Sequence, residues 1–260
     1  MKKYILFATI FILAVFAFIS FKHLFWPTFS DFVKKQSLPE ETRIVITQTP
    51  LVSPSGTIID FAGINLAVPF SPQAPYADWS LPYQESCEET SAILVDKFYK
   101  NETITPEIAD KEILKLVEWQ KKRFGYYFHT TAKETSIMLR EYFGYKKVDV
   151  LNDISIETIK SHILAGRPVI VPLAGQMAGN PYYRQPGPVY HMLVIKGVTK
   201  DGDFITNDVG TKRGQNYVYD DEVLFNAIHD APTGGDGWDV ANPEEYVKTG
   251  RKTIVVVYPN

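Results

Sequence analysis

The order of the periodic segments constrains the fold of this chain more than any other feature of its sequence. Apolar residues recur at helical spacing in three segments between Cys87 and Gly144. Strand-like apolar runs then prevail from Lys146 to the C-terminus, and the connections among them are of hairpin length. Helices followed by hairpin-connected strands predict an α+β domain, with N-terminal helices packed on a mainly antiparallel sheet.

Caps and turn residues set the limits of the predicted elements. Thr105 and Pro106 fit the N-cap and first position of a helix, and Gly144 fits a helix end. The proline-containing stretch from Ile64 to Glu89 predicts an extended approach to the first helix. The expected helices cover residues 87–100, 105–122, 131–144, 155–166 and 221–230, and the expected strands cover 146–151, 167–175, 190–198, 203–208, 215–220 and 252–259.

The N-terminal segment predicts one transmembrane helix. Lys2 and Lys3 precede an uncharged stretch from Tyr4 to Phe21, which is just long enough to span a bilayer. Its bulky end lacks the small residues of a cleavage site, so we interpret residues 1–25 as an anchor rather than a cleaved signal peptide. The lysines then stay in the cytoplasm, which places the C-terminal domain outside it. Cleavage would instead release a secreted protein. Residues 26–65 are interpreted as a stalk and residues 66–260 as one domain.

Composition argues against several classes of function. The net charge of −3 gives no electrostatic case for binding nucleic acid. Cys87 is the single cysteine, so it is either a thiol with a chemical role or a small apolar filler. His129, His191 and His229 lack recognisable metal-ligand spacing, and neither a metal nor another cofactor is expected.

Cys87 stands at the predicted start of a helix. Ser86 and Glu89 have the spacing of a capping box, which makes Cys87 the first helical residue. The positive helix end and its unpaired N–H groups would lower the thiol pKa and stabilise an oxyanion. Glu88 and Glu89 oppose this, because nearby carboxylates disfavour a thiolate. A small buried residue at a helix start is the alternative interpretation of Cys87.

His191 is the histidine best placed to act as a base. It begins a strand that is otherwise apolar except for Lys196. A hairpin with the strand that ends at Asp208 would return this carboxylate to the same end of the sheet, where it can fix the tautomer of the imidazole. The alternatives are a satisfied interior histidine and an aspartate in an ordinary turn.

Five stretches of the chain together resemble the cysteine peptidase family 39-like domains, which are papain-like and related to bacteriocin-processing peptidases. They are VPFSPQAPYADWS, YQESCEETSAILV, AGRPVIVPLAG, YHMLVIKGV and FITNDVG. The resemblance covers about residues 66–258 and includes the chain order of cysteine, histidine and aspartate. It implies a papain-like fold, Cys87 as nucleophile, His191 as base, Asp208 as the group that orients it, and Gln84 as the oxyanion-hole glutamine.

A long loop rich in Gly, Pro and Tyr separates two of the predicted strands, at AGQMAGNPYYRQPGPVY. Loops of this kind often bind substrate, and we expect Tyr182, Tyr183, Arg184 and Tyr190 to line a substrate cleft. An ordered surface loop whose aromatic residues pack inward is the alternative.

These features predict a membrane-anchored cysteine peptidase that acts on a peptide or protein through a thioester intermediate. The expected partners are that substrate and the membrane. A catalytically inactive module that binds peptides at the cell envelope is the alternative, favoured by the acidic neighbours of Cys87. A structural envelope protein is a third possibility.

Overall fold

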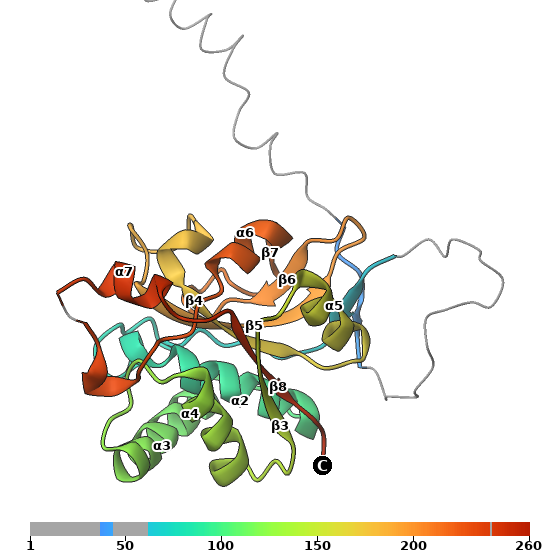
Figure 1. The fold of residues 1–260 in the computed structure, drawn as a ribbon. Coiled ribbons are helices and arrows are strands. Elements are labelled where there is room, and N and C mark those ends of the chain that lie inside the picture. The colour runs from blue at the N-terminus through green and yellow to red at the C-terminus, as the bar shows by residue number, and fades with distance from the viewer. Residues whose placement is uncertain (1–36, 44–61, 240) are drawn as a thin grey trace, which may run out of the picture. The chain divides into compact units, whose positions relative to one another are not determined.

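The computed structural model describes residues 37–43, 62–239 and 241–260 (Figure 1). The predicted anchor from Tyr4 to Phe21 lies outside these residues, as does most of the predicted stalk. Within the described ranges, no helix combines the length and apolar character needed to cross a membrane. The chain divides into two units between Leu38 and Pro39, and the second unit, Pro39–Asn260, contains the sheet and the helices.

The predicted helices and strands are all found, with shifts of a few residues at their ends. The helices are η1 (Tyr83–Glu85), α2 (Cys87–Lys100), α3 (Pro106–Phe124), α4 (Ala132–Ile137), η2 (Met138–Tyr142), α5 (Ile156–Leu164), η3 (Gly175–Ala178), α6 (Asp221–Ala227), η4 (Gly235–Gly237) and α7 (Pro243–Lys248). The strands are β1 (Glu41–Thr42), β2 (Ile64–Leu66), β3 (Val148–Asn152), β4 (Val169–Ala174), β5 (Tyr190–Val198), β6 (Phe204–Asn207), β7 (Tyr217–Tyr219) and β8 (Thr253–Val257). The predicted α+β class is therefore confirmed.

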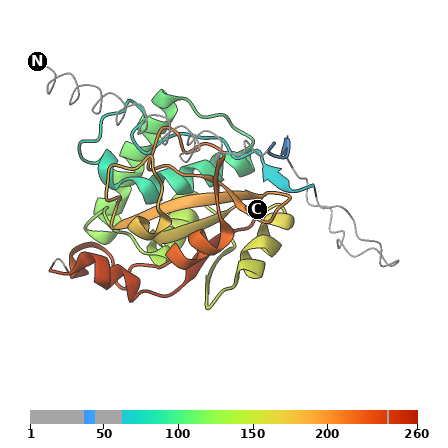
Figure 2. The same ribbon diagram turned by 90° about the horizontal axis from the view of Figure 1, so that it is seen from above.

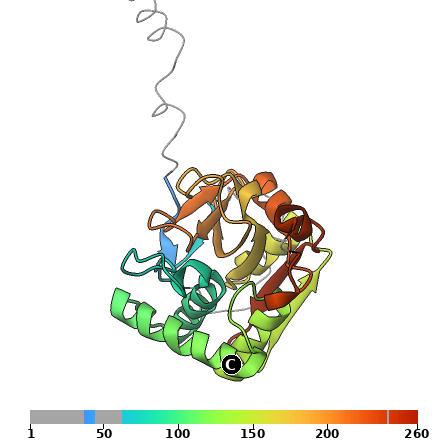
Figure 3. The same ribbon diagram turned by 90° about the vertical axis from the view of Figure 1, so that its left-hand side faces the viewer.

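The strands form one mainly antiparallel sheet. Its order is β1-β2-β5-β4-β8-β3, with β6 paired to β5 and β7 paired to β6. Only the pairing of β1 with β2 is parallel within the described residues. Viewed from above, the orange strands lie between cyan and green helices on one side and red and yellow segments on the other (Figure 2). The side view shows the same separation, with the green helices α3 and α4 along one edge (Figure 3).

Alternate residues of the central strands supply two hydrophobic cores. Ile170, Met192 and Val194 pack in the core that contains the apolar face of α2. Val171 and Leu193, their neighbours in sequence, pack in the second core with residues of α5 and α6. A strand buried on both faces needs apolar residues at every position, which is why β4 and β5 are almost continuous apolar runs.

Local signals in the sequence explain where several helices begin. Thr105 caps α3 by accepting a hydrogen bond from the Ile108 N–H at 3.3 Å, with Pro106 in the first turn. Thr131 and Glu134 form a capping box at the start of α4. The helix predicted over residues 131–144 continues from α4 into η2, which has π-helical geometry.

A short segment before residue 44 also belongs to the sheet. β1 pairs with β2, and the Asn65 side-chain amide donates to the Pro39 carbonyl at 3.2 Å. The ammonium group of Lys196 on β5 is fully buried and donates to Glu41 of β1 at 2.6 Å and to Asn216 at 2.7 Å. The charged residue in the otherwise apolar β5 run thus has a counterion that comes from far away in the sequence.

Candidate active site

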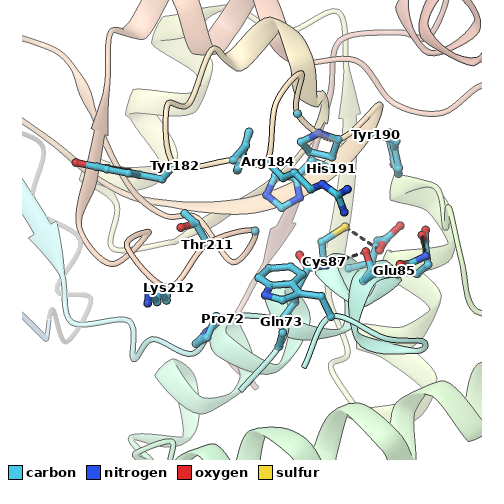
Figure 4. A pocket seen from close by; sticks show the side chains of 18 of the residues that line it. Pro72, Gln73, Glu85, Cys87, Tyr182, Arg184, Tyr190, His191, Thr211 and Lys212 are labelled. Atoms are coloured by element: carbon cyan, nitrogen blue, oxygen red, sulfur yellow. Dashed lines mark hydrogen bonds between the residues drawn. The ribbon is translucent and has the colours of Figure 1, made fainter. Parts of the chain in front are cut away.

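A cleft of about 630 Å³ is lined by every side chain that the sequence selects except Asp208, which is buried. Its walls come from the extended segment 72–79, from η1 with the start of α2, from the loop 182–190 with His191, and from the turn 210–212. Cys87 and His191 project into this cleft from the helix and the sheet respectively (Figure 4). The helix wall consists of segment 72–79, η1 and the start of α2, and the sheet wall consists of the loop 182–190, His191 and the turn 210–212.

Cys87 is the first residue of α2, as expected, but the expected capping box does not form. The Ser86 hydroxyl donates to the Pro82 carbonyl at 2.9 Å and makes no cap hydrogen bond. The Glu89 carboxylate accepts instead from the Gln120 amide of α3. A local contact thus uses the side chain of Ser86 and a tertiary contact uses that of Glu89, and the helix begins where η1 ends.

The Cys87 thiol is hydrogen-bonded to the carboxyl group of Glu88, and its surroundings disfavour the thiolate, as the acidic neighbours in the sequence indicate. Its sulfur donates to Glu88 Oε2 at 3.0 Å. A dashed line leads from the sulfur of Cys87 in Figure 4. Burial raises the pKa of the thiol well above its usual value, and the charges of Glu88, Glu89 and Glu85 raise it further. These effects outweigh the lowering of the thiol pKa that is expected from the N-terminus of the helix. Among the described residues, the thiol donates no hydrogen bond to His191.

Glu88 is fixed in place between the sulfur and the backbone. Only 1% of its surface is exposed, and its second oxygen, Oε1, accepts from the Thr130 N–H at 3.0 Å. Burial raises the pKa of this carboxyl to about 8, although the hydrogen bond from Cys87 lowers it in part. The helix wall therefore presents a carboxyl that binds and releases a proton near neutral pH.

His191 and Asp208 form a buried pair on the sheet wall. His191 Nε2 lies 2.9 Å from Asp208 Oδ1, and 2% and 0% of the two residues are exposed. Burial alone would raise the pKa of Asp208, but the charge of His191 and the hydrogen bonds to the carboxylate lower it to about 2. Because Nε2 is engaged, Nδ1 is the ring nitrogen left for chemistry in the cleft.

The β5–β6 hairpin places this pair. Val194 of β5 is opposite Asn207 of β6, so Asp208 follows directly at the edge of the ladder. The Gly210 N–H then donates to Asp208 Oδ1 at 3.0 Å. A side chain at residue 210 would be excluded, because a Cβ there would lie 2.8 Å from Cε1 of His191. The glycine thus permits the close approach of backbone and imidazole.

The residues expected to bind substrate all line the cleft, but they differ in exposure. Tyr182 is 45% exposed, and Arg184 is also exposed at the cleft. Tyr183 and Tyr190 are buried. Their hydroxyls are engaged, since Tyr183 donates to Asp208 at 2.6 Å, and Tyr190 donates at 3.1 Å to both Asp230 and the Thr130 carbonyl. Tyr182 and Arg184 are therefore the two with free surface for a ligand.

Two glutamines line the helix wall. Gln84 is exposed, and its amide donates to Glu85 Oε1 at 3.2 Å. Gln73, which sequence reasoning missed, is buried and donates to the Tyr83 and Gln84 carbonyls at 2.9 and 3.0 Å. Gln73 thus holds the turn that leads into Cys87, a contact between distant residues for which the sequence offers no local signal.

The sequence also gave no sign of the further partners of Asp208. Tyr219 donates to Asp208 Oδ2 at 2.6 Å, and the Asn180 amide donates to the same oxygen at 2.9 Å. Tyr219 comes from β7 and Asn180 from the loop after η3. Together with Tyr183 they give Oδ2 of Asp208 three donors, which keeps the carboxylate ionised and immobile.

A comparison with protein-family models identifies one family. The model of the Peptidase_C39 like family matches residues 65–231. The chain is also similar to the crystal structure of a provisionally assigned C39-like peptidase from Bacillus anthracis, at 14% identity and a TM-score of 0.45, over 75% of this chain and 96% of that one. A search of curated proteins gave no match. The match to the family model spans more than half of the chain.

Proposed function

Because the chain belongs to the Peptidase_C39 like family, we propose that it is a papain-like cysteine peptidase that cleaves a peptide or protein bond. One observation supports this most strongly. The single cysteine and a histidine with a buried carboxylate partner line the same cleft, although they are far apart in sequence. A nucleophile, a base and an orienting group in one place are what thiol-based acyl transfer requires.

In the proposed mechanism, Nδ1 of His191 takes the proton of Cys87. The resulting thiolate attacks the carbonyl carbon, and the imidazolium then protonates the leaving amine. Water, deprotonated by His191, hydrolyses the thioester and regenerates the thiol. Asp208 keeps Nε2 engaged throughout, which fixes the ring orientation and stabilises the imidazolium.

The oxyanion would form beside the first turn of α2. The N–H of Cys87 lies in this turn, where backbone donors have no intrahelical acceptor. Gln84 is the proposed second donor, and its amide must leave Glu85 to act. Tyr182 and Arg184 are the proposed substrate contacts. The membrane anchor at Tyr4–Phe21, with the peptidase domain outside the cytoplasm, completes the proposal and rests on the sequence alone.

The test is covalent labelling with a peptidyl electrophile that needs an activated thiol. The folded chain should label at Cys87, and labelling should be lost in Cys87→Ala and fall at least about a hundredfold in His191→Ala. His229→Ala is the matched control, because His229 bonds the Gly250 carbonyl and does not line the cleft. Equal labelling of the native chain and His191→Ala would overturn the proposal.

A catalytically inactive peptide-binding module is the second candidate. The hydrogen bond from the Cys87 thiol to Glu88 favours it, because a protonated thiol is a poor nucleophile. This candidate predicts that peptides bind the cleft, that no probe labels Cys87 above a denatured control, and that Cys87→Ala leaves peptide binding intact.

A further inference from the structure

The side chain of Glu88 lies in direct contact with the sulfur of Cys87. It is the immediate neighbour of Cys87 and the acceptor of its thiol at 3.0 Å. Its other oxygen is held by the Thr130 N–H, and almost none of its surface reaches solvent. The carboxyl therefore stays in contact with the sulfur, because a rotation away would leave the Thr130 N–H buried without an acceptor.

We propose that Glu88 is a positioning residue that gates the nucleophile, because its carboxylate form holds Cys87 as a thiol and only its neutral form permits a thiolate. This gate deepens the proposed function, since it acts on the same sulfur.

The ionised and the protonated forms of Glu88 differ in their effect on the sulfur. Attack requires the thiol proton to pass from sulfur to Nδ1 of His191, which leaves a sulfur anion beside Glu88. If Glu88 is ionised, two negative charges face each other at 3.0 Å with no hydrogen between them. If Glu88 carries a proton, its O–H donates to the sulfur anion along the same line. The competent site thus holds one proton on His191 and one on Glu88.

The surrounding charges do not relieve this repulsion. Acidic groups approach the sulfur from α2 and η1, where Glu89 and Glu85 both raise the pKa of Cys87. The other titratable or charged groups around the site are Tyr190 and His191 from β5, Asp230 beside Tyr190, His129 from the loop before α4, Tyr182, Tyr183 and Arg184 from the loop before β5, and Lys212 from the turn 210–212. His129 faces Glu85 at 3.7 Å, and the basic groups at the cleft include Arg184, which lies on the side of His191 in Figure 4. The burial of Glu88 raises its pKa to about 8, so this proton exchanges near neutral pH.

The experiment follows the rate of Cys87 alkylation by iodoacetamide as a function of pH, on the full chain. In Glu88→Gln the amide oxygen can still accept from Thr130, but no negative charge faces the sulfur. We expect the alkylation profile of this variant to move to lower pH, with about tenfold faster labelling at pH 9, where about nine in ten of the Glu88 carboxyls are ionised. A melting curve checks that the variant is folded.

Two further variants keep the test decisive. Glu85→Gln removes a more exposed carboxylate near the same sulfur, and it should shift the profile in the same direction by less. It replaces the first variant if Glu88→Gln does not fold. Glu141→Gln, on an exposed pair with Arg123, should leave the profile unchanged. An unchanged profile in Glu88→Gln would overturn the gate, and a shift to higher pH would make Glu88 a base instead.

The gate and the peptidase proposal fail in different ways. A faster-labelling Glu88→Gln variant without any cleavage of peptides supports the gate and counts against the peptidase. Peptide cleavage by the native chain, together with identical alkylation profiles for the native chain and Glu88→Gln, overturns the gate and leaves the peptidase standing.

Discussion

The two walls of the cleft each bury a carboxyl to the same extent, yet the two groups behave in opposite ways. On the sheet wall, the contacts of Asp208 with His191 and Tyr183 overcome the effect of burial and lower its pKa to about 2. On the helix wall, Glu88 accepts from a thiol and from the Thr130 N–H, and burial raises its pKa to about 8.

This difference shows that donors, rather than depth, decide which buried acid is charged. A carboxylate with several donors, a histidine among them, stays ionised, whereas one beside a weak S–H donor and other acids prefers its proton. The sheet wall is built to hold a fixed charge, and the helix wall is built to exchange a proton. Separating two acids in this way divides their roles between a permanent anion and a group that titrates.

Among substitutions that change the difference between the two walls, Asp208→Asn has the largest expected effect. The substitution removes the charge that orients His191, and we expect kcat to fall by about 10²- to 10⁴-fold. Weakening the hydrogen bonds of this buried carboxylate should also lower the free energy of unfolding by about 1–3 kcal/mol. Rates on a cleaved peptide and urea unfolding measure the two effects. Asp153→Asn, on an exposed pair with Arg251, is the control and should change both by little.

The pH dependence of stability tests the helix wall. The pKa of Glu88 rises from 4.5 to about 8 on folding, so its contribution is present below about pH 4.5 and is lost as the pH rises through 8. Glu88→Gln lacks this dependence, and between pH 4.5 and 8 the native chain should lose at most about 5 kcal/mol relative to the variant. Melting curves at several pH values measure it, and parallel curves for the two proteins would contradict the raised pKa.

The sheet wall depends on close packing as well as on charge, and Gly210→Ala tests this. The added methyl group would lie 2.8 Å from the His191 ring, so the imidazole must move. A displacement of this size should cost about 10²-fold in kcat. Gly144→Ala is the matched control, because its strain comes from a backbone φ of +83° with no atom within 4 Å of the new methyl. It should lower stability without lowering the rate per folded molecule.

The smallest expected effect comes from removing one donor to Asp208. Tyr219→Phe deletes a hydrogen bond of 2.6 Å to the carboxylate, which should cost about 1.5 kcal/mol of stability and raise the pKa of Asp208. Calorimetry and an acid titration followed by NMR measure these changes. Tyr217→Phe is the control, because the Tyr217 hydroxyl makes no hydrogen bond to the described residues. An equal effect in both variants would show that Tyr219 acts through packing rather than through its hydroxyl.

Much of the fold could be predicted because its signals are local. β4, β5 and β8 are apolar runs that need no partner to be recognised, and caps such as Thr105 lie within four residues of the groups they bind. The return of Asp208 to His191 follows from a single hairpin, so its geometry too is encoded over a short stretch.

The electrostatic state of the thiol could not be predicted from the same signals. The spacing of Ser86 and Glu89 matches a capping box, but the side chain of Glu89 reaches Gln120 of α3, and Ser86 binds back to Pro82. The sequence indicated that Glu88 opposes a thiolate, but whether this opposition exceeds the effect of the helix end depends on burial. Burial is a property of the assembled tertiary structure.

The ion pair between Lys196 and Glu41 has a consequence for where the chain can be cut. The family match begins at residue 65, whereas the counterion of the fully buried ammonium comes from residue 41. A fragment that begins at residue 65 would keep the buried ammonium group of Lys196 in β5 and lack the Glu41 carboxylate that neutralises it. We therefore expect the smallest stable fragment to include Glu41, which precedes the start of the family match.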